Sequence, residues 1–480
     1  MSYRLDSLAP QALFRFFEDI SAIPRGSGNL KGITAFLCDF AEQRGLDCYS
    51  DDTFNVLIKK GGSAGRENEA PLMLQAHTDM VCEKLVGCEH DFLKEGIDLV
   101  IDGDFLKADG TTLGGDDGIG VALMLAILDD PSLSHPPLEC LFTADEETGM
   151  DGAFAFDYSR LSAKRMINLD ASGENEITAG CAGGINILHR LELDAVRNEN
   201  KLLKIEVKGL AGGHSGADIH LGRANATRIL ARVLLDVYEQ EVFNLVSFDA
   251  GTKLTAITRE GTVLIAADDV KRVSACIAAK EKEIRKELNK DDARFSLRVS
   301  KAPMRESCFS YRDTRRLLTL LALVPNGVLH MSKDLEGIVD TSSNVGVVKT
   351  EGNTVSITCS LRSMQESRLN ELITLHKFIS KEFDTRYEEG YGYPGWEFVS
   401  GSPIQKRYID SYRTLFSDKE PYVTAVHAGL ECGLMSKRVP GMDAISVGPV
   451  MFDIHTPSER LSISSCKRFY RVICHILENA

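Results

Sequence analysis

The sequence lacks the features that mark membrane-bound, secreted and nucleic-acid-binding proteins. It has no apolar run that approaches 18 residues, and its N-terminus, MSYRLDSLAPQALFRFF, has no basic segment followed by an apolar core and a cleavage site. We therefore expect neither a membrane-spanning helix nor a secretory signal. Lysine and arginine total 55 against 70 acidic residues, a net charge of −15. Nucleic acid and anionic membranes call for clustered basic residues, so we expect neither partner and predict a cytoplasmic protein.

Cysteine is present but lacks any pattern that would give it a structural role. The twelve cysteines form no CxxC pair and no regular spacing. A thiolate metal site and a disulfide framework are thus not expected, and we predict reduced, mostly buried thiols. The chain also has no internal repeat or low-complexity tract. At 480 residues with 43% apolar residues, it exceeds what one hydrophobic core supports, which predicts two domains.

The order of predicted elements indicates a first domain interrupted by an insertion. Helices and short apolar strands alternate up to about residue 185. The predicted elements then follow an α+β pattern, and the last 85 residues return to the alternating pattern of the first part. The prediction is an α/β fold with a discontinuous domain, a mixed sheet between helices, formed by residues 1–185 and 396–480, and an inserted α+β domain of residues 186–395. The main expected elements of the first domain are helices 10–23, 30–44, 405–416, 425–436 and 465–478, and strands 55–59, 72–76, 102–107, 138–143, 165–169 and 443–447. Residues 391–396, rich in Gly, Tyr and Pro, are predicted to be the return linker.

Acidic residues and histidines follow several of these strands. A lone His-x-Asp such as His77 and Asp79 is more often a surface pair, and Asp116 and Asp117 at a helix start could be N-caps. The repetition is harder to explain by solubility, since ligand sites of open α/β sheets form beyond the carboxyl ends of strands. We therefore predict one shared site from the residues at these ends: His77, Asp79, Asp116 or Asp117, Glu146, Glu147, Asp170 and His455.

These side chains offer imidazole and carboxylate ligands without thiolate. Such ligands suit Zn²⁺, Mn²⁺ or Co²⁺, and five or six of them exceed the three protein ligands of one catalytic zinc. Two metals are implied, which a bridging carboxylate can hold at about 3.5–4 Å around a shared water. Of the adjacent acids, Glu147 can bind metal while Glu146 acts as general base.

The sequence resembles the aminoacyl-histidine (Xaa-His or β-alanyl-histidine) dipeptidases, a branch of the dizinc exopeptidases related to glutamate carboxypeptidase and carnosinase. The resemblance covers essentially the whole chain and rests on these motifs in order: LQAHTDMVCEK at 74–84, GTTLGGDDGIG at 110–120, TADEETGMDGA at 143–153, MINLDASGE at 166–174, GLAGGHSGADIHLGRANA at 209–226, HAGLECG at 427–433 and FDIHTPSE at 452–459.

The resemblance implies roles for the predicted site. Asp116 would bridge two metals, most simply zinc with manganese or cobalt as alternatives. His77 and Asp170 would complete one position, and Glu147 and His455 the other. Asp79 would orient His77, Glu146 would be the general acid/base, and the Asp116–Asp117 peptide would be cis. The family commonly has Asn at the second of these positions, which favours Asp116 over Asp117 as the ligand.

The inserted domain would then be a lid and dimerisation domain of a zinc-exopeptidase-like fold. Its His214 would polarise the scissile carbonyl, Arg362 would hold the substrate carboxylate, and Gly429 in HAGLECG would contact substrate. Thr255 departs from the family, which usually has Asn there. A hydroxyl is shorter and offers one donor rather than two, so preference for histidine is less secure than dipeptide hydrolysis itself.

Other functions remain to be separated. A dizinc amidohydrolase acting on N-acyl amino acids would use the same metal site, and a non-catalytic metal-binding scaffold would be expected to lack a ligand or Glu146, whereas all are present. A dehydrogenase reading of GGDDGIG is unfavourable because its acids stand where a pyrophosphate would approach. The preferred expectation is a metallopeptidase that acts on unblocked dipeptides, Xaa-His in particular, with a possible homodimer through the inserted domain.

Overall fold

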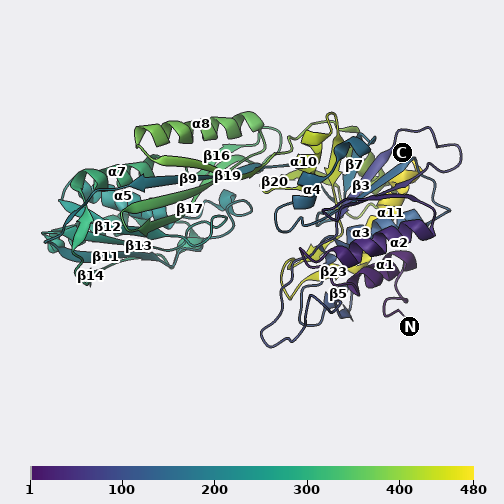
Figure 1. The fold of residues 1–480 in the computed structure, drawn as a ribbon, viewed down its shortest axis with the longest axis horizontal. Helices are drawn as coiled ribbons and strands as arrows, with labels where there is room; N and C mark the ends of the chain where they lie inside the picture. The colour runs from purple at the N-terminus through teal and green to yellow at the C-terminus, as the bar shows by residue number, and fades with distance from the viewer. Residues whose placement is uncertain (1–2, 480) are drawn as a thin grey trace. The chain divides into compact units, whose positions relative to one another are not determined.

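The computed structural model describes residues 3–479, and these form two compact units. The first unit comprises Met1–Cys181, Trp396–Ala425 and Leu430–Ala480, and the second Ala182–Gly395 and Val426–Gly429. The chain thus enters the second unit after residue 181, where the sequence suggested 185, and returns after residue 395 (Figure 1).

An eight-stranded mixed sheet organises the first unit. Its spatial order is β1 (Asp47–Ser50), β2 (Val56–Lys60), β6 (Leu138–Thr143), β3 (Leu72–His77), β7 (Arg165–Asn168), β21 (Asp443–Ser446), β8 (Glu176–Cys181) and β20 (Tyr422–Val426). The four central strands β6, β3, β7 and β21 are parallel to one another, and the flanking pairs β1–β2, β2–β6 and β21–β8 are antiparallel. The carboxyl ends of the parallel strands therefore share one edge of the sheet.

The central strands are continuous apolar runs because helices cover both faces of such a sheet. Every residue of β3 is buried, and so is almost the whole of the helix that follows the glycine-rich turn. The helices of this unit are α1 (Gln11–Ser21), α2 (Lys31–Gln43), α3 (Gly115–Asp129), α4 (Asp151–Ala155), α9 (Pro403–Leu415), α10 (Glu431–Arg438) and α11 (Ile463–Glu478). A small sheet of order β22 (Met451–Phe452), β23 (Arg460–Ser462), β5 (Phe105–Ala108) and β4 (Leu99–Asp102) completes the unit.

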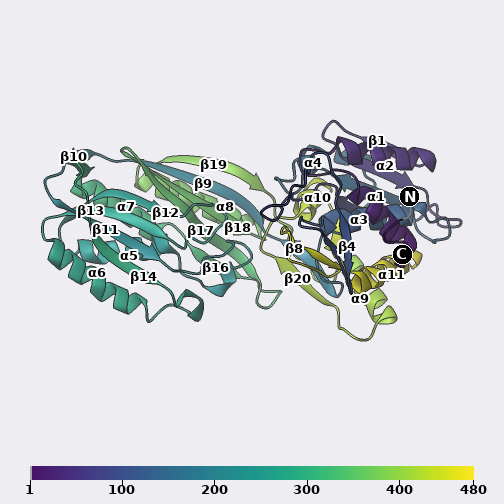
Figure 2. The ribbon, with the colours of Figure 1, turned by 90° about the horizontal axis from the view of Figure 1, so that it is seen from below.

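The second unit is built on an antiparallel sheet with its own core. The strand order is β14 (Ser296–Ala302), β11 (Lys201–Lys208), β13 (Gly261–Ala267), β12 (Phe243–Ala250), β17 (Val339–Glu351), β18 (Thr354–Ser363), β9 (Gly183–Glu192) and β19 (Arg386–Tyr393), and β16 (Gly327–Met331) also pairs with β17. Helices α5 (Ala226–Tyr238), α6 (Val270–Ile284), α7 (Tyr311–Leu323) and α8 (Glu366–Glu382) pack on this sheet (Figure 2). A short pair, β10 (Ala195–Arg197) with β15 (Ser307–Phe309), lies beside it.

The structure corrects three local predictions. Residues 102–107 form a hairpin of β4 and β5 rather than one strand, because Gly103 adopts φ +60° and turns the chain. The helix predicted over 425–436 is the strand β20 followed by the shorter α10, since the run between them contains Gly429 and apolar Tyr422–Val426 pairs in the sheet. Residues 391–393 of the predicted linker belong to β19.

Within the described part of the chain, no helix combines the length and apolar character that a membrane crossing requires.

Candidate metal centre

The carboxyl end of β3 supplies a histidine and the carboxylate that holds it. His77 is the last residue of the strand, and its Nδ1 lies 3.4 Å from Oδ1 of Asp79. The Asp79 carboxylate also accepts the backbone N–H groups of Glu146 (3.0 Å) and Glu147 (3.2 Å) and the hydroxyl of Ser27 (2.7 Å). Asp79 therefore positions the two glutamates as well as the imidazole. Its pKa is lowered to about 2, because the bonds from His77, Ser27 and Glu146 outweigh burial, which alone would raise it.

Asp116 stands where the glycine-rich turn becomes α3. The turn passes through Gly114 at φ +66°, and the backbone at Asp116 and Asp117 is non-helical, so the regular helix starts after them. The Asp116–Asp117 peptide is cis, as the resemblance implied. Asp117 is fully buried and packs on Gly120, where a Cβ would lie 2.4 Å from its Oδ1. The first aspartate faces the site, and the second faces the protein interior.

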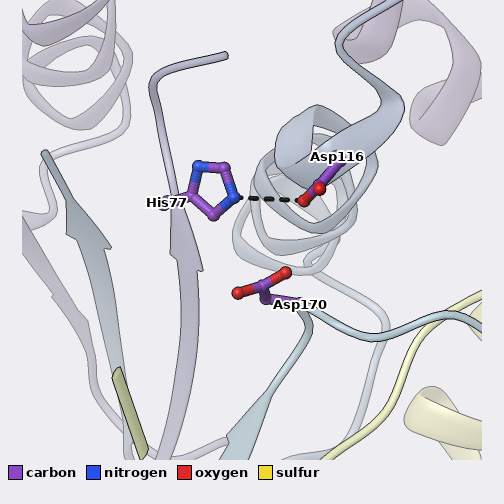
Figure 3. A group of neighbouring side chains, drawn as sticks. All are labelled: His77, Asp116 and Asp170. Carbon is purple, nitrogen blue, oxygen red and sulfur yellow. Dashed lines mark hydrogen bonds and ion pairs between the residues drawn. The ribbon is translucent and has the colours of Figure 1, made fainter. Parts of the chain in front are cut away.

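The two carboxylate oxygens of Asp116 point to different histidines. Oδ1 lies 3.1 Å from Nε2 of His77, and Oδ2 lies 3.2 Å from Nε2 of His455. Figure 3 shows His77, at its strand end, and Asp116, at its helix start, turned toward each other, with Asp170 beside them on the turn after β7. One carboxylate thus reaches both histidines, the arrangement that a bridging ligand requires.

The ligand atoms fall into groups that fit a metal ion. Those of His77, Asp116 and Asp170 all lie within 4.8 Å of one another, and so do those of Asp116, Glu147 and His455. We refer to these groups as the His77 position and the His455 position. Asp116 belongs to both, and Nε2 of His455 lies 2.8 Å from Oε1 of Glu147. The donors are nitrogen and oxygen only, so they fit two borderline divalent cations such as zinc, manganese or cobalt.

Electrostatics also favour cations at this edge. Burial and the neighbouring acids, Asp116 first, raise the pKa of Asp170 well above its ordinary value. The hydrogen bonds of His455 to Asp116 and Glu147 raise its pKa to about 10, because the imidazole is the counter-charge available to both acids. Buried carboxylates that outnumber their counter-charges are costly, and divalent cations would remove that cost.

Glu146 lies close to one predicted ligand of each metal position, His77 and Glu147. Its carboxylate groups with the ligand atoms of His77 and Glu147 within 4.8 Å. Burial raises its pKa to about 8, and the acids Glu431, Glu147 and Asp116 add to the shift while His77 opposes it. A carboxylate that holds a proton weakly near neutral pH can both accept and donate one, which suits a general acid/base.

In the second unit, the structure groups two of the predicted substrate residues. Nδ1 of His214 accepts the backbone N–H groups of Gly216 (3.2 Å) and Ala217 (3.0 Å), so the neutral ring carries its proton on Nε2. Burial lowers the pKa of His214, and the nearby Arg362 guanidinium lowers it further. Nη1 of Arg362 donates to the Tyr393 hydroxyl at 2.7 Å. The pair thus offers a neutral donor beside a fixed positive charge.

The other two residues predicted to contact the substrate, Gly429 and Thr255, lie outside the named helices and strands. Gly429 packs against the Tyr393 ring, where an added Cβ would lie 2.6 Å from a ring carbon, so only glycine fits. Thr255 contributes its backbone carbonyl, which accepts the N–H of Ser215 at 2.8 Å.

Sequence reasoning missed two buried residues of the HAGLECG motif. His427 accepts or donates a 2.6 Å hydrogen bond with the Ser342 hydroxyl, and burial, aided by Arg362, lowers its pKa to about 3. Glu431 begins α10, where Gln75 and Thr143 donate to its Oε2 at 2.6 and 2.8 Å. The motif is visible in the sequence, but the hydrogen-bond partners of its two polar residues come from distant segments of the chain.

Comparison with known proteins places the chain in a family. The model of the Peptidase family M20/M25/M40 matches residues 73–479. The chain belongs to this family. The resemblance to a family of metal-dependent exopeptidases that the motifs indicated is thereby confirmed, and the chain has the fold of a metallopeptidase with an inserted domain.

Relatives within the family match nearly the whole chain. The cytosol non-specific dipeptidase of Escherichia coli K12 is 37% identical over 478 residues, covering 99% of this chain and 98% of its own. The crystal structure of aminoacylhistidine dipeptidase from Vibrio alginolyticus superposes with a TM-score of 0.93 at 34% identity, covering 99% and 98% of the two chains. The aminopeptidase PepT of Bacillus cereus shares the fold, with a TM-score of 0.57 at 15% identity over 98% of each chain.

Proposed function

We propose that this protein is a metal-dependent dipeptidase that hydrolyses unblocked dipeptides, Xaa-His among them, with two divalent cations per chain. The observation that carries the proposal is Asp116, whose two oxygens face His77 and His455 at 3.1 and 3.2 Å. A relative named as a dipeptidase covers the same length at 37% identity, which supports the substrate class.

The five ligands divide as the family pattern implies. His77, Asp116 and Asp170 would hold one cation, and Asp116, Glu147 and His455 the other, zinc being the first choice. When bound, such cations lower the pKa of a water molecule and stabilise negative charge on a carbonyl oxygen. Asp79 fixes the His77 ring and, through its bonds to two backbone N–H groups, the Glu146–Glu147 pair.

Glu146 moves the proton that hydrolysis requires. As the water oxygen attacks the carbonyl carbon of the peptide bond, the Glu146 carboxylate takes its proton. The C–N bond then breaks, and Glu146 delivers that proton to the leaving amine. Its buried carboxylate, grouped with the ligand atoms of His77 and Glu147, suits both halves of this transfer.

The second unit would bind the substrate. His214 carries its proton on Nε2, so it can donate to the carbonyl oxygen as negative charge develops there. Arg362, fixed by the Tyr393 hydroxyl, would hold the free carboxylate, and Gly429 and Thr255 would contact the substrate backbone.

Substrate preference separates this function from its nearest alternative, a deacylase acting on N-acyl amino acids with the same metals. We expect kcat/KM in Zn²⁺, Mn²⁺ or Co²⁺ to be highest for unblocked dipeptides, including Xaa-His, and lowest for N-acetyl amino acids. A strong chelator should abolish the activity. Full activity without metal would contradict the mechanism, and a preference for N-acyl substrates would favour the deacylase.

We further propose a cytoplasmic homodimer formed through the second unit. The strand β16 leaves apolar Val328, Leu329 and Met331 exposed by 37, 36 and 50%. An exposed apolar edge strand is a template for pairing with a second copy. Light scattering over a range of concentrations should give a dimer, and Leu329→Lys should shift it toward monomer. A monomer at every concentration would contradict this arrangement.

A further inference from the structure

Two buried charged side chains hold the turn that carries Asp116. The Glu459 carboxylate accepts four consecutive backbone N–H groups, those of Leu113 (2.8 Å), Gly114 (3.1 Å), Gly115 (2.8 Å) and Asp116 (3.4 Å). Nη2 of Arg25 donates to the carbonyl oxygen of Gly114 in the same turn. Gly114 is therefore held by an anion at its N–H and by a cation at its carbonyl.

Arg25 joins this turn to the end of β3. Its Nη1 donates to the carbonyl oxygens of Thr78 (3.0 Å) and Asp79 (3.1 Å), directly after His77. The neighbouring Gly26 forms a parallel bridge with Met80, so the loop runs alongside the strand end. Arg25 is 2% exposed, and its hydrogen bonds go to backbone carbonyls of both segments. One guanidinium thus sets how far the His77 segment lies from the Asp116 turn.

Glu459 makes the corresponding connection to the His455 loop. It lies four residues after His455 and is 3% exposed, and its carboxylate reaches the Asp116 turn rather than its own loop. Glu459 is the first of the acids whose negative charge offsets the burial of Arg25, followed by Asp79, Asp117 and Asp116. Together, Arg25 and Glu459 connect the bridging aspartate to a histidine of each metal position.

The glycines of GGDDGIG make room for this arrangement. A Cβ at Gly114 would lie 2.6 Å from Nη2 of Arg25, and one at Gly118 would lie 2.4 Å from the same atom. The glycine-rich turn is therefore shaped around a guanidinium of the chain itself.

We propose that Arg25 and Glu459 are positioning residues, each of which supports chiefly one half of the metal centre. Arg25 sets the separation of Asp116 from His77, and Glu459 sets its separation from His455. This proposal rests on the two-metal site of the proposed function. Within that site, Arg25 supports the His77 position and Glu459 supports the His455 position.

Metal affinity tests this division directly. Arg25→Lys keeps the charge but loses the planar fork, and Glu459→Gln keeps the shape but loses the charge. Matched controls are Arg165→Lys and Glu139→Gln. In the wild-type chain, Arg165, at the amino end of β7, donates to the Ala70 carbonyl, and the buried Glu139 carboxylate accepts the N–H groups of Ser162 and Ala163. Competition of Co²⁺ or Zn²⁺ with a chelator gives both affinities of each variant. We expect a loss of about 10- to 100-fold at one position in each site variant and none in the controls.

Double variants identify the affected position. Arg25→Lys should lower the affinity for the remaining metal ion in a His455→Ala background and have little effect in a His77→Ala background. Glu459→Gln should lower this affinity in the His77→Ala background and have little effect in the His455→Ala background. Equal losses at both positions, or losses no larger than in the controls, would overturn the proposal. Failure of the wild-type chain to bind two metals would instead contradict the proposed function.

A measurement without variants covers the case in which a substitution prevents folding. In the metal-free wild-type chain, hydrogen exchange at the amides of residues 113–116 should be slow, because Glu459 holds all four N–H groups without a metal. Rapid exchange there, with the neighbouring β3 amides protected, would show that the two charges do not hold the turn and would overturn the proposal.

Discussion

The two units differ in the charge of their buried titratable side chains. In the first, parallel strands direct acids and histidines to one edge, where Asp79, Asp116 and Glu147 form ion pairs with only two imidazoles. In the second, the sheet is antiparallel, and its buried His189 and His376 bond to each other at 3.0 Å as neutral rings. Burial lowers their pKa values to about 4 and about 3.

The first unit depends on a ligand, and the second does not show this dependence at its buried histidines. The two neutral rings share one hydrogen bond, and His189 forms its second with the Thr385 hydroxyl, so this pair holds together without a positive charge. The first unit carries carboxylates whose pKa values are raised by burial and then by one another, as expected of a site that binds cations.

The largest effect is expected in the first unit, at Glu146. Glu146→Gln keeps the shape and hydrogen bonding but removes the base, so kcat should fall by about 10²- to 10⁴-fold while both metals remain bound. Steady-state kinetics and elemental analysis of the same sample check this. Loss of metal with retained turnover would mean that Glu146 and Glu147 have exchanged roles.

Substitutions in the second unit should alter catalysis without altering metal content. His214→Ala removes a donor to the developing oxyanion, for which the expected loss in kcat is about 10²- to 10³-fold. Arg362→Ala should raise KM more than it lowers kcat, since the carboxylate is held in the ground state as well. Both constants should be measured on one dipeptide. An unchanged kcat for the histidine variant, with metals bound, would leave the second unit without a part in the chemistry.

The second unit should also be sensitive to acid. His189 and His376 have lower pKa values folded than the 6.5 or so of the unfolded chain, so the unfolded chain binds more protons below that pH. Stability is complete above pH about 6.5 and should fall by about 1.4 kcal/mol per pH unit for each histidine, until about pH 4 for His189. Hydrogen exchange of β9 and α8 peptides from pH 7 to 5 measures this. The variant His376→Gln should flatten the dependence, and an unchanged slope would contradict the assignment.

The sequence was sufficient for the fold of the first unit and for the grouping of its site, for physical reasons. Strands such as Leu138–Thr143 are continuous apolar runs, and parallel strands bring their carboxyl ends to one edge, so His77 and Asp170 were expected to meet. The helix predicted over 425–436 was right for residues 431–436, which belong to α10, and wrong at its start, because residues 422–426 pair in the sheet as β20. The contacts of Arg25 and Glu459 could not be foreseen, since both bind backbone groups, which leave no pattern in the sequence.

Metal stoichiometry tests the central claim most directly. Elemental analysis of the wild-type chain, loaded with Zn²⁺ and freed of excess, should give close to two ions per chain. Asp116→Asn should lose both, because its carboxylate faces both histidines, whereas His455→Ala should lose chiefly one. The Glu146→Gln variant should retain two and serves as the control. One ion per wild-type chain, or two retained in Asp116→Asn, would contradict a centre bridged by Asp116.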